Sequence, residues 1–435
     1  MTIVDFLSFV LYFLLFVGIL IWLNYLARRV QETWLSFVRA DFFSKQKYAL
    51  LEIGIPRGQT KSPLAMELFL NCLYQPFGEG IWKDYWFKGT TKPWFSLELV
   101  SMEGKVKFFI WTREGQVQLI KTQLYAQFPD IDIKEIYQGD YKNDYVHGFE
   151  YDLEKYKFTC LEFRKKGADH LPIRTYVDYG LDRDPKEEFK IDPITTVLEY
   201  LGSLGKGEYA WIQIGVRAPG KDRSKPVPED SAKAADFRKS YKLKWYQSAA
   251  QVDWTDAAKE DIKKLSKKDA ATVAEMRLSK LDEEKLNAVE RGLTKIAFDA
   301  NIRAIYFANK DVFSPANSAG LMGVMRQYNT LHLNSFEIRS PLVKRAWMDK
   351  SGKKVNTDKK SIFEQYKYRA FFYPGYIPIT GTNIWLSNGY ITGKPFILTT
   401  EELATMFHFP GDTAKTTNVS RVEAKKVEPP ANLPV

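Results

Sequence analysis

Apolar residues are most densely gathered at the start of the chain. Residues 6–26 read FLSFVLYFLLFVGILIWLNYL and carry no charged side chain. A helix of about 20 apolar residues crosses the roughly 30 Å hydrocarbon core of a bilayer. Trp22 and Tyr25, near the end of this run, are typical of the headgroup layer. The pattern therefore predicts a transmembrane anchor over residues 1–29.

The charges that flank this run predict its orientation. Arg28 and Arg29 follow it directly, whereas the first five residues carry only Asp5. Because basic flanks favour the cytoplasmic side, we expect a single-pass protein of the cell (inner) membrane, with the bulk of the chain in the cytoplasm. A cleaved signal peptide fits less well, since no basic region precedes the run and no small-residue cleavage site follows it.

A helical pattern continues behind the anchor, over residues 30–47. Its apolar residues recur at helical spacing and are Trp34, Leu35, Val38 and Phe42. Two interpretations are open. The segment is either a juxtamembrane helix that lies along the bilayer, or a continuation of the anchor helix that packs on the soluble part of the chain.

Shorter strand and helix patterns alternate over residues 48–140. Met102-Glu103-Gly104 favours a hairpin turn, and Ser62-Pro63 is typical of a helix start. The order β-α-β-β-α-β is that of a ferredoxin-like domain. We predict strands at Tyr48–Pro56, Trp94–Ser101, Lys105–Thr112 and Ile131–Tyr137, and helices at Ser62–Tyr74 and Gln116–Gln127.

Spacing within this domain also predicts which side chains share a face. Leu64, Leu68 and Cys72 fall on one face of the first predicted helix, so we expect Cys72 to be a small core residue. In the first strand of the predicted hairpin, apolar residues alternate with polar ones: Phe95, Leu97 and Leu99 against Ser96 and Glu98.

The same order recurs over residues 141–340. Asp192-Pro193 and Ser314-Pro315 are typical of helix starts. We predict strands at Leu171–Asp178, at Glu208–Arg217, within Thr294–Asn309 and at Leu333–Ile338, and helices at Pro193–Leu201 and Ala316–Gln327. The sequence therefore predicts an α+β protein, in which an N-terminal transmembrane helix precedes two ferredoxin-like (βαββαβ) domains.

The second predicted domain contains a helical insertion over residues 218–292. It opens with several prolines and then becomes rich in Lys, Glu, Ala and Leu, with charges of both signs. A short apolar stripe lies near its end: Leu278, Leu281, Leu286, Val289 and Leu293. We expect a protruding helical hairpin, either an arm that docks a partner or a solvated elaboration that packs on its own domain.

The residues that carry chemistry argue against several classes of protein. Among 435 residues there are 2 Cys and 4 His, without HExxH or CxxH spacing, so neither a disulfide scaffold nor a zinc enzyme is expected. Walker A, GxSxG and kinase motifs are missing from the sequence. We therefore expect a protein that is not an enzyme, with no catalytic, metal-ligating or cofactor-binding residues and no cofactor.

The net charge of +10 is compatible with nucleic acid or anionic lipid as a partner. The candidates on one predicted sheet face are Lys105 and Lys107, beside the aromatic residues Phe109 and Trp111. The candidates in the segment over residues 344–360 are Lys353 and Lys354. The sheet face is either a nucleic-acid surface or a packing face. The segment is either a contact to DNA or lipid, or a solvated loop.

Residues 341–435 are expected to form a C-terminal extension and linker. Ile362–Phe372 has the pattern of a strand or a helix. Thr399 with Glu402 is typical of a capping box and predicts a short helix that Pro410 ends. The closing VEPPANLP has the composition of an extended linker.

Several strings in residues 48–435 carry a family resemblance. ILTTEELATMFHFP, followed by EPPANLP, and the earlier LEIGIPRG, SLELVS and LYAQFPDIDI resemble the membrane-anchored N-terminal region of type IV secretion (conjugative) ATPases of the HerA/FtsK-like superfamily. They are also similar to a family of bacterial membrane proteins that carries that region. In the ATPases a P-loop motor follows, whereas no residue here matches a nucleotide-binding motif.

The resemblance implies a non-catalytic assembly module of a conjugation or type IV secretion-like system. Its expected partners are the lipid bilayer, a separate P-loop ATPase and DNA. Leu403, Phe407 and Phe409 are candidate partner-docking anchors, because apolar side chains at a helix end fill a partner's pocket. The alternative is that they pack on the protein's own sheet. A membrane-tethered nucleic-acid-binding protein is the second functional interpretation.

Overall fold

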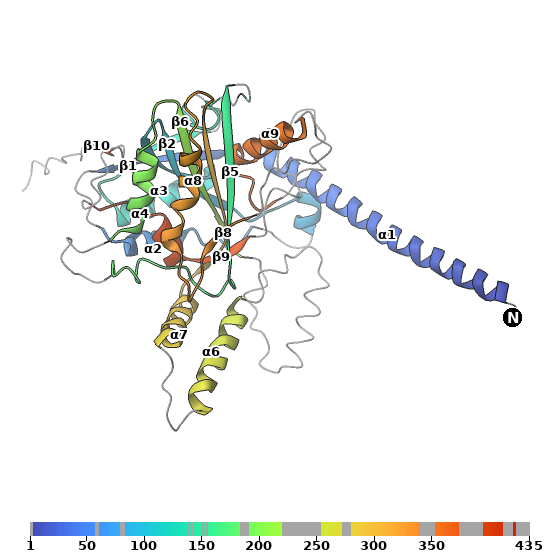
Figure 1. The fold of residues 1–435 in the computed structure, drawn as a ribbon. Coiled ribbons are helices and arrows are strands. Elements are labelled where there is room, and N and C mark those ends of the chain that lie inside the picture. Colours follow the sequence, from blue (N-terminus) through green and yellow to red (C-terminus); the bar gives the residue numbers. More distant parts are fainter. Residues whose placement is uncertain are drawn as a thin grey trace, which may run out of the picture.

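A computed structural model describes most of the chain outside several loops, part of the insertion and the C-terminal tail. The described residues are 3–56, 61–78, 83–137, 139–140, 143–149, 152, 155–182, 191–219, 254–271, 280–339, 353–373, 395–411 and 421–422. Within them, one long helix projects from a body in which helices cover both faces of a sheet (Figure 1).

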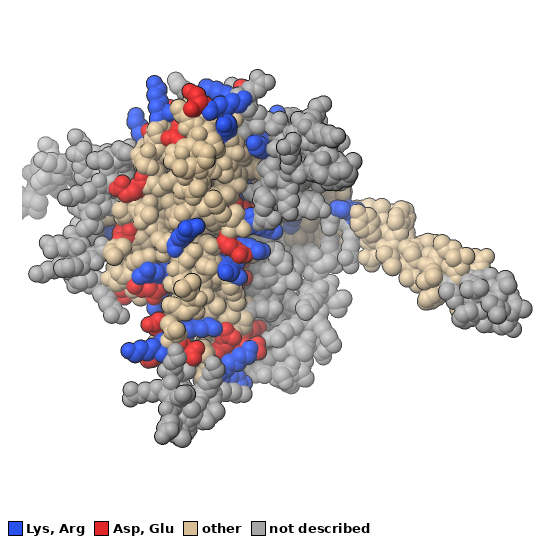
Figure 2. Space-filling view, viewed as in Figure 1, with Lys and Arg blue, Asp and Glu red and all other residues tan. Residues whose placement is uncertain are grey.

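The projecting helix is α1 (Ile3–Ser44), which runs without a break through both the predicted anchor and the segment behind it. The continuation of the anchor helix is therefore confirmed. α1 is long and apolar enough to cross a membrane. In Figure 2 the part of α1 drawn in tan shows no Lys, Arg, Asp or Glu until it nears the body. There Val38 and Phe43 are buried.

The first half of the body contains four antiparallel strands in the order β4-β1-β3-β2. Glu103 and Gly104 have φ angles of 53° and 83°, so the predicted β2–β3 hairpin and its turn are confirmed. The elements of the first half are β1 (Tyr48–Pro56), α2 (Pro63–Cys72), the π-helical turn η1 (Asp84–Lys88), β2 (Trp94–Met102), β3 (Lys105–Arg113), η2 (Glu114–Gln116), α3 (Val117–Gln127) and β4 (Asp132–Tyr137).

The second half repeats this order as β8-β5-β7-β6, again with antiparallel neighbours. The two halves share one sheet because β2 pairs with β6. Two short strands, β9 (Phe396–Thr399) and β10 (Arg421–Val422), complete ten strands among the described residues. Its elements are β5 (Tyr156–Lys165), α4 (Pro193–Gly202), β6 (Glu208–Arg217), α6 (Trp254–Ala271), α7 (Lys280–Leu293), β7 (Ala297–Asn309), α8 (Pro315–Gly323), η5 (Arg326–Tyr328) and β8 (Phe336–Ile338).

The strand predicted at Leu171–Asp178 is wrong. These residues form loops and turns, and the first strand of the second half is β5, at Tyr156–Lys165. The reason is that side chains satisfy the backbone here. The amide of Ile173 donates to the Glu402 carboxylate at 3.0 Å, and the amide of Tyr176 donates to Thr405 Oγ1 at 2.8 Å.

The face predicted to be buried on the first helix is also wrong. Leu64 and Leu68 on α2 are 43% and 51% exposed, whereas Met66, Phe69 and Leu70 are fully buried. Cys72 is half-buried and packs against the edge of this core, so its predicted place in the core is confirmed only in part. Glu67 shares the buried face because it belongs to a network of polar contacts.

The sheet has a core on each face. On one face lie α2, α3, α4, α8 and α10 (Thr400–Met406). On the other, an aromatic layer is covered by the end of α1 and by α9 (Lys353–Lys367). Both faces of β2 are therefore buried, and Ser96 and Glu98 are inaccessible to solvent. Of the two structures considered for Ile362–Phe372, the helix is confirmed as far as Lys367.

The insertion contains α6 and α7, which lie against each other and project from the body (Figure 1). Its base packs on the body, since Trp254 and Val289 are buried and His170 Nε2 lies 2.9 Å from Asp261 Oδ2. Leu281, from the predicted stripe, is exposed. Residues 220–253 and 272–279, including Leu278, lie outside the described residues, as do residues 340–352, 374–394 and the EPPANLP tail.

Candidate functional site

The C-terminal box, residues 396–410, is built into the sheet and its helical layer. β9 (Phe396–Thr399) pairs with β7 and leads directly into α10. The predicted capping box is confirmed: the amide of Glu402 donates to Thr399 Oγ1, and the amide of Thr399 donates to Glu402 Oε2 at 2.8 Å. The box is therefore held from both ends, by strand pairing and by its cap.

The three candidate docking anchors lie inside the protein. Leu403, Phe407 and Phe409 are at most 1% exposed. The ring of Phe407 lies 5.7 Å from that of Phe108 on β3, and the ring of Phe409 lies 4.9 Å from that of Phe128 after α3. This is the alternative in which they pack on the protein's own sheet. In this fold none of the three presents a surface to a partner.

A buried ion pair fixes α10 to β5. Lys165 Nζ lies 2.7 Å from Glu402 Oε1, and both side chains are 1% exposed. The same carboxylate closes the capping box and accepts the amide of Ile173, so its hydrogen-bonding capacity is used fully. Removing one partner would leave an uncompensated buried charge, so the pair is costly to break.

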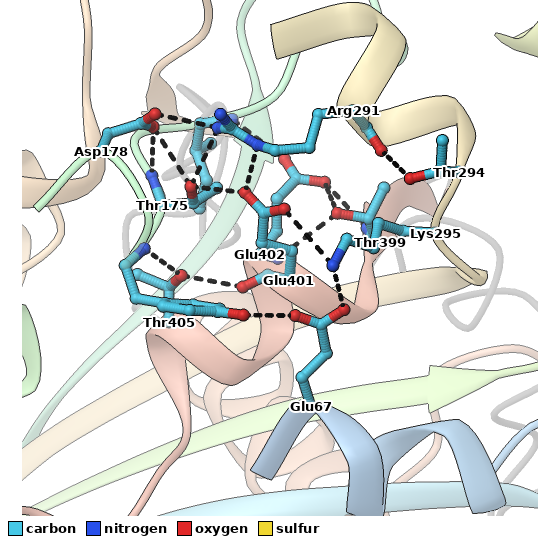
Figure 3. A network of polar contacts seen from close by, with 12 residues as sticks. Glu67, Thr175, Asp178, Arg291, Thr294, Lys295, Thr399, Glu401, Glu402 and Thr405 are labelled. Carbon is cyan, nitrogen blue, oxygen red and sulfur yellow. Dashed lines mark hydrogen bonds and ion pairs between the residues drawn. The ribbon is translucent and has the colours of Figure 1, made fainter. Parts of the chain in front are cut away.

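A second ionic network joins α2, α7 and α10 nearer the surface. Figure 3 shows Glu67 of α2 and Glu401 of α10 pointing toward Lys295 and Arg291. Arg291 Nε lies 2.9 Å from Glu401 Oε1, and Lys295 Nζ lies 2.7 Å from Glu67 Oε1. Burial raises the pKa of Glu401, although Thr175 and the two cations oppose this shift. Burial disfavours the charge of Arg291, but Glu401 and Asp178 outweigh it and raise its pKa.

These two networks hold elements together. Tyr176 donates its hydroxyl to Glu67 at 2.6 Å, and Thr175 donates its hydroxyl to Glu401 at 2.6 Å. Segments far apart in the sequence thereby converge on the C-terminal box. The carboxylates of Glu67 and Glu401 are used here in contacts between elements of the same chain.

A cavity of about 140 Å³ lies where α1 enters the body. Asp144 and His147, on the loop after β4, form part of its wall, and His147 Nδ1 lies 2.8 Å from Asp144 Oδ2. Burial opposes the charge of Asp144, but His147 and Arg369 outweigh it and hold its pKa well below its usual range. The remaining lining comes mainly from the end of α1, from β1 and β4, from Lys367 at the end of α9 and from Tyr368, which follows it.

Sequence reasoning missed this Asp–His pair. The available signal was the i, i+3 spacing of Asp144 and His147 in DYVHG, which brings two polar side chains together in a turn. The charge of Arg369 also attracts Asp144. Arg369 itself donates to Glu98 at 2.9 Å inside the aromatic layer. Tyr145 donates to the same carboxylate at 2.7 Å. The loop and the end of α9 are thus held by one buried carboxylate on β2.

The predicted basic sheet face lies beneath the aromatic layer. Phe109 stacks on Tyr145 with ring centroids 5.0 Å apart, and Trp111 stacks on Tyr48 at 4.6 Å. Lys107 pairs with Glu52 at 2.5 Å. These contacts support the packing interpretation for the aromatic members, whereas Lys105 is exposed at the hairpin. Lys353 and Lys354 begin α9, and their side chains lie outside the described part of the chain.

Comparison with known proteins adds no relative to this picture. No protein-family model matches the chain. A search of curated proteins also finds no match.

Proposed function

We propose that this protein is a non-catalytic, membrane-anchored assembly module. The observation that carries the proposal is α1, which continues from an exposed apolar run of membrane-spanning length into the core of a folded body. An anchor of this kind holds whatever the body binds at a fixed distance from the bilayer. We place the protein in the cell (inner) membrane with the body in the cytoplasm.

The contacts between α1 and the body support a rigid connection between the anchor and the body. Phe43 near the end of α1 packs edge-on against Trp94 of β2, with ring centroids 5.4 Å apart. The Arg113 guanidinium lies over both Trp94 and Phe42. Because these contacts begin in the helix itself, the anchor enters the body without an intervening linker.

We further propose that each half of the body is a ferredoxin-like unit. The strand order within each half, β4-β1-β3-β2 and β8-β5-β7-β6, supports this assignment, since the split βαβ arrangement places the first and third strands side by side between the second and fourth. The two units then share an edge through β2 and β6.

The partner follows from the family resemblance. Strings such as SLELVS and LYAQFPDIDI belong to β2, α3 and β4 and are similar to the N-terminal module of conjugative, type IV secretion-like ATPases. We propose a separate P-loop ATPase as the partner. Because Leu403, Phe407 and Phe409 are buried, its docking surface lies elsewhere on the body, and the α6–α7 arm is the alternative considered above.

Copurification tests this proposal. The full-length tagged protein is solubilised from membranes of its native host, and recovered proteins are identified by mass spectrometry. We expect a P-loop ATPase that an unrelated tagged single-pass protein does not recover. Calorimetry on the purified protein should detect no ATP binding. Stoichiometric ATP binding, or recovery of partners without any P-loop ATPase, contradicts the proposal.

The nucleic-acid alternative has weaker support. Base stacking requires exposed aromatic side chains, and Phe109 and Trp111 are buried. Strongly salt-dependent affinity of the full-length protein for DNA would favour this alternative.

A further inference from the structure

A short turn far from the anchor in sequence is docked on α1. Trp34 donates its indole N–H to the carbonyl of Trp86 in η1 at 2.8 Å. Arg39 donates to the Tyr85 hydroxyl at 3.0 Å and lies over its ring. These contacts tie η1 to the part of α1 that lies between the apolar run and the body.

Gly89, which ends this turn, makes the close approach possible. Its φ is +62°, and a Cβ at this position would lie 2.6 Å from the carbonyl oxygen of Val38. A side chain is therefore excluded by both backbone conformation and space. The position of η1 against the helix is set by this contact.

The docked turn and the helix together expose apolar side chains beside cations. We define the interfacial patch as Val30, Trp34, Phe37 and Phe87. Phe37 and Phe87 are 62% and 63% exposed, and Trp34 is 45% exposed with its ring 6.4 Å from that of Phe37. The exposed basic residues around it are Arg29, Lys83 and Lys88, of which Lys88 pairs with Asp84 at 2.7 Å.

The distance from the apolar run determines what covers this patch. At 1.5 Å per residue, Val30 lies about 6 Å and Phe37 about 16 Å beyond Leu26 along the helix axis. The headgroup layer adds roughly 5–7 Å to each side of the hydrocarbon core. Spanning helices tilt by about 20° and up to about 40°. At a tilt of about 40° toward η1 the axial rise of Phe37 falls to about 12 Å. An element packed about 10 Å from the helix axis lies about 6 Å lower still on the tilted side, which brings Phe87 to this layer, where aromatic and basic side chains are both favoured.

We propose that η1 and the adjoining turns of α1 form a second membrane contact. Phe87 and Trp34 lie in the headgroup layer of the bilayer that α1 crosses, Phe37 lies at its outer edge, and the neighbouring cations face anionic lipid. This inference rests on the proposed membrane anchoring by α1. It adds that the body is held at two points, so that its tilt relative to the membrane is fixed.

Photo-crosslinking of the full-length protein tests this contact. Three variants carry p-benzoylphenylalanine in place of Phe87, Phe16 or Tyr125, in vesicles of phosphatidylethanolamine and phosphatidylglycerol. Phe16 lies in the apolar run of α1, and Tyr125 is partly exposed on α3, across the sheet from α1. We expect lipid adducts at positions 16 and 87 and none at position 125.

The outcomes separate this inference from the proposed function. If position 16 forms no lipid adduct, membrane anchoring itself is contradicted. If position 16 reacts with lipid but position 87 does not, only the second contact is overturned. Crosslinks from position 87 to a second copy of the protein, in place of lipid, also overturn it, because the patch would then be an interface between copies.

A glycine substitution tests whether docking on α1 positions the turn. In the protein labelled at position 87, Gly89→Ala should lower the yield of lipid adduct several-fold by displacing η1. Gly115→Ala is the matched control, since a Cβ at Gly115 meets no atom within 4 Å. Equal yields from the two variants overturn the docked geometry as the cause of the contact.

Discussion

Two neighbouring residues on β5 differ greatly in how they use their charge. Arg164 lies 2.6 Å from Glu337 with side chains 55% and 34% exposed, whereas Lys165 lies 2.7 Å from Glu402 with both side chains 1% exposed. Successive side chains on a strand point to opposite faces, so one pair is solvated and the other is enclosed. Similar distances therefore carry different energies.

Removing one charge from the enclosed pair should be costly. Lys165→Met leaves Glu402 buried without its cation, and we expect a loss of about 3–5 kcal/mol in the free energy of unfolding. Arg164→Met is the matched control, with an expected loss of at most about 1 kcal/mol. Chemical denaturation of the detergent-solubilised protein measures both values. Equal losses would show that burial does not determine how much each ion pair contributes to the free energy of unfolding.

His408 gives the C-terminal box a dependence on pH. Its Nε2 lies 3.0 Å from Asp192 Oδ1, and its Nδ1 lies 2.8 Å from the Ala404 carbonyl oxygen. Burial opposes the charge of His408, but Asp192 and these hydrogen bonds outweigh it and raise its pKa above 6.5. Burial likewise opposes the charge of Asp192, but His408 outweighs it and lowers its pKa below 3.8.

The sign of these shifts predicts a window of stability. The contribution of His408 is complete below pH 6.5 and is lost as pH rises through its higher folded-state pKa. The contribution of Asp192 is present above pH 3.8 and is lost on acidification. We expect the free energy of unfolding to fall above pH 6.5 in the native protein and to fall less in His408→Asn. His332→Asn, at a partly exposed pair with Glu284, should retain the native profile when unfolding is measured from pH 5 to 9.

At the scale of elements, two helix starts that both carry a preferred N-cap residue differ in structure. Thr399 caps α10 through its side chain, and Glu402 completes the reciprocal bond. Ser62 precedes the proline that begins α2, yet its side chain makes no capping hydrogen bond. The third residue of the helix is Glu402 in α10 and Ala65 in α2, so only α10 can form the reciprocal bond. In α2 the amide of Ala65 donates to the backbone carbonyl of Ser62 at 3.0 Å.

Substitution of the two cap residues should therefore have unequal effects. Thr399→Ala removes an N-cap bond, with an expected cost of about 1 kcal/mol or somewhat more. Ser62→Ala should change the free energy of unfolding by a few tenths of a kcal/mol at most. Denaturant titration of each variant checks the comparison. A larger effect at Ser62 would contradict the assignment of caps.

The elements show where sequence reasoning succeeds and where it cannot. The predicted bounds of Tyr48–Pro56 and Glu208–Arg217 match the observed strands, because a mostly apolar run of this length bounded by turn residues specifies a buried strand. Leu171–Asp178 also has a strand pattern, yet its amides bond to α10 more than 200 positions away. On α2 the buried Glu67 reversed the predicted face for a similar reason. Long-range polar partners leave no local periodicity.

At the scale of the whole molecule, the two halves share their central strands. β2 and β6 pair over the full length from Trp94 with Arg217 to Met102 with Tyr209. The apolar core on one face includes residues from both halves, and so does the aromatic layer on the other. Neither half has a core that ends at the boundary between them.

The body should therefore unfold as one unit. We expect the slowest amide hydrogen exchange in β2 and β6, with the same opening free energy at Leu97, Leu99, Ile212 and Ile214, because these strands are buried on both faces. Exchange measured by mass spectrometry on the full-length protein in nanodiscs gives these values. Two distinct opening free energies, one for each half, would contradict a single cooperative unit.

The place where α1 enters the sheet has a mechanical consequence. Three residues separate the helix from β1, which is bonded to β3 on one side and to β4 on the other. Antiparallel hydrogen bonds run perpendicular to their strands, so a pull along β1 loads both rows in shear and strains many bonds at once. In the membrane-anchored assembly that we propose, a force between the bilayer and a partner on the body would be borne by an interior strand. Tension on the anchor meets the most resistant direction of the sheet.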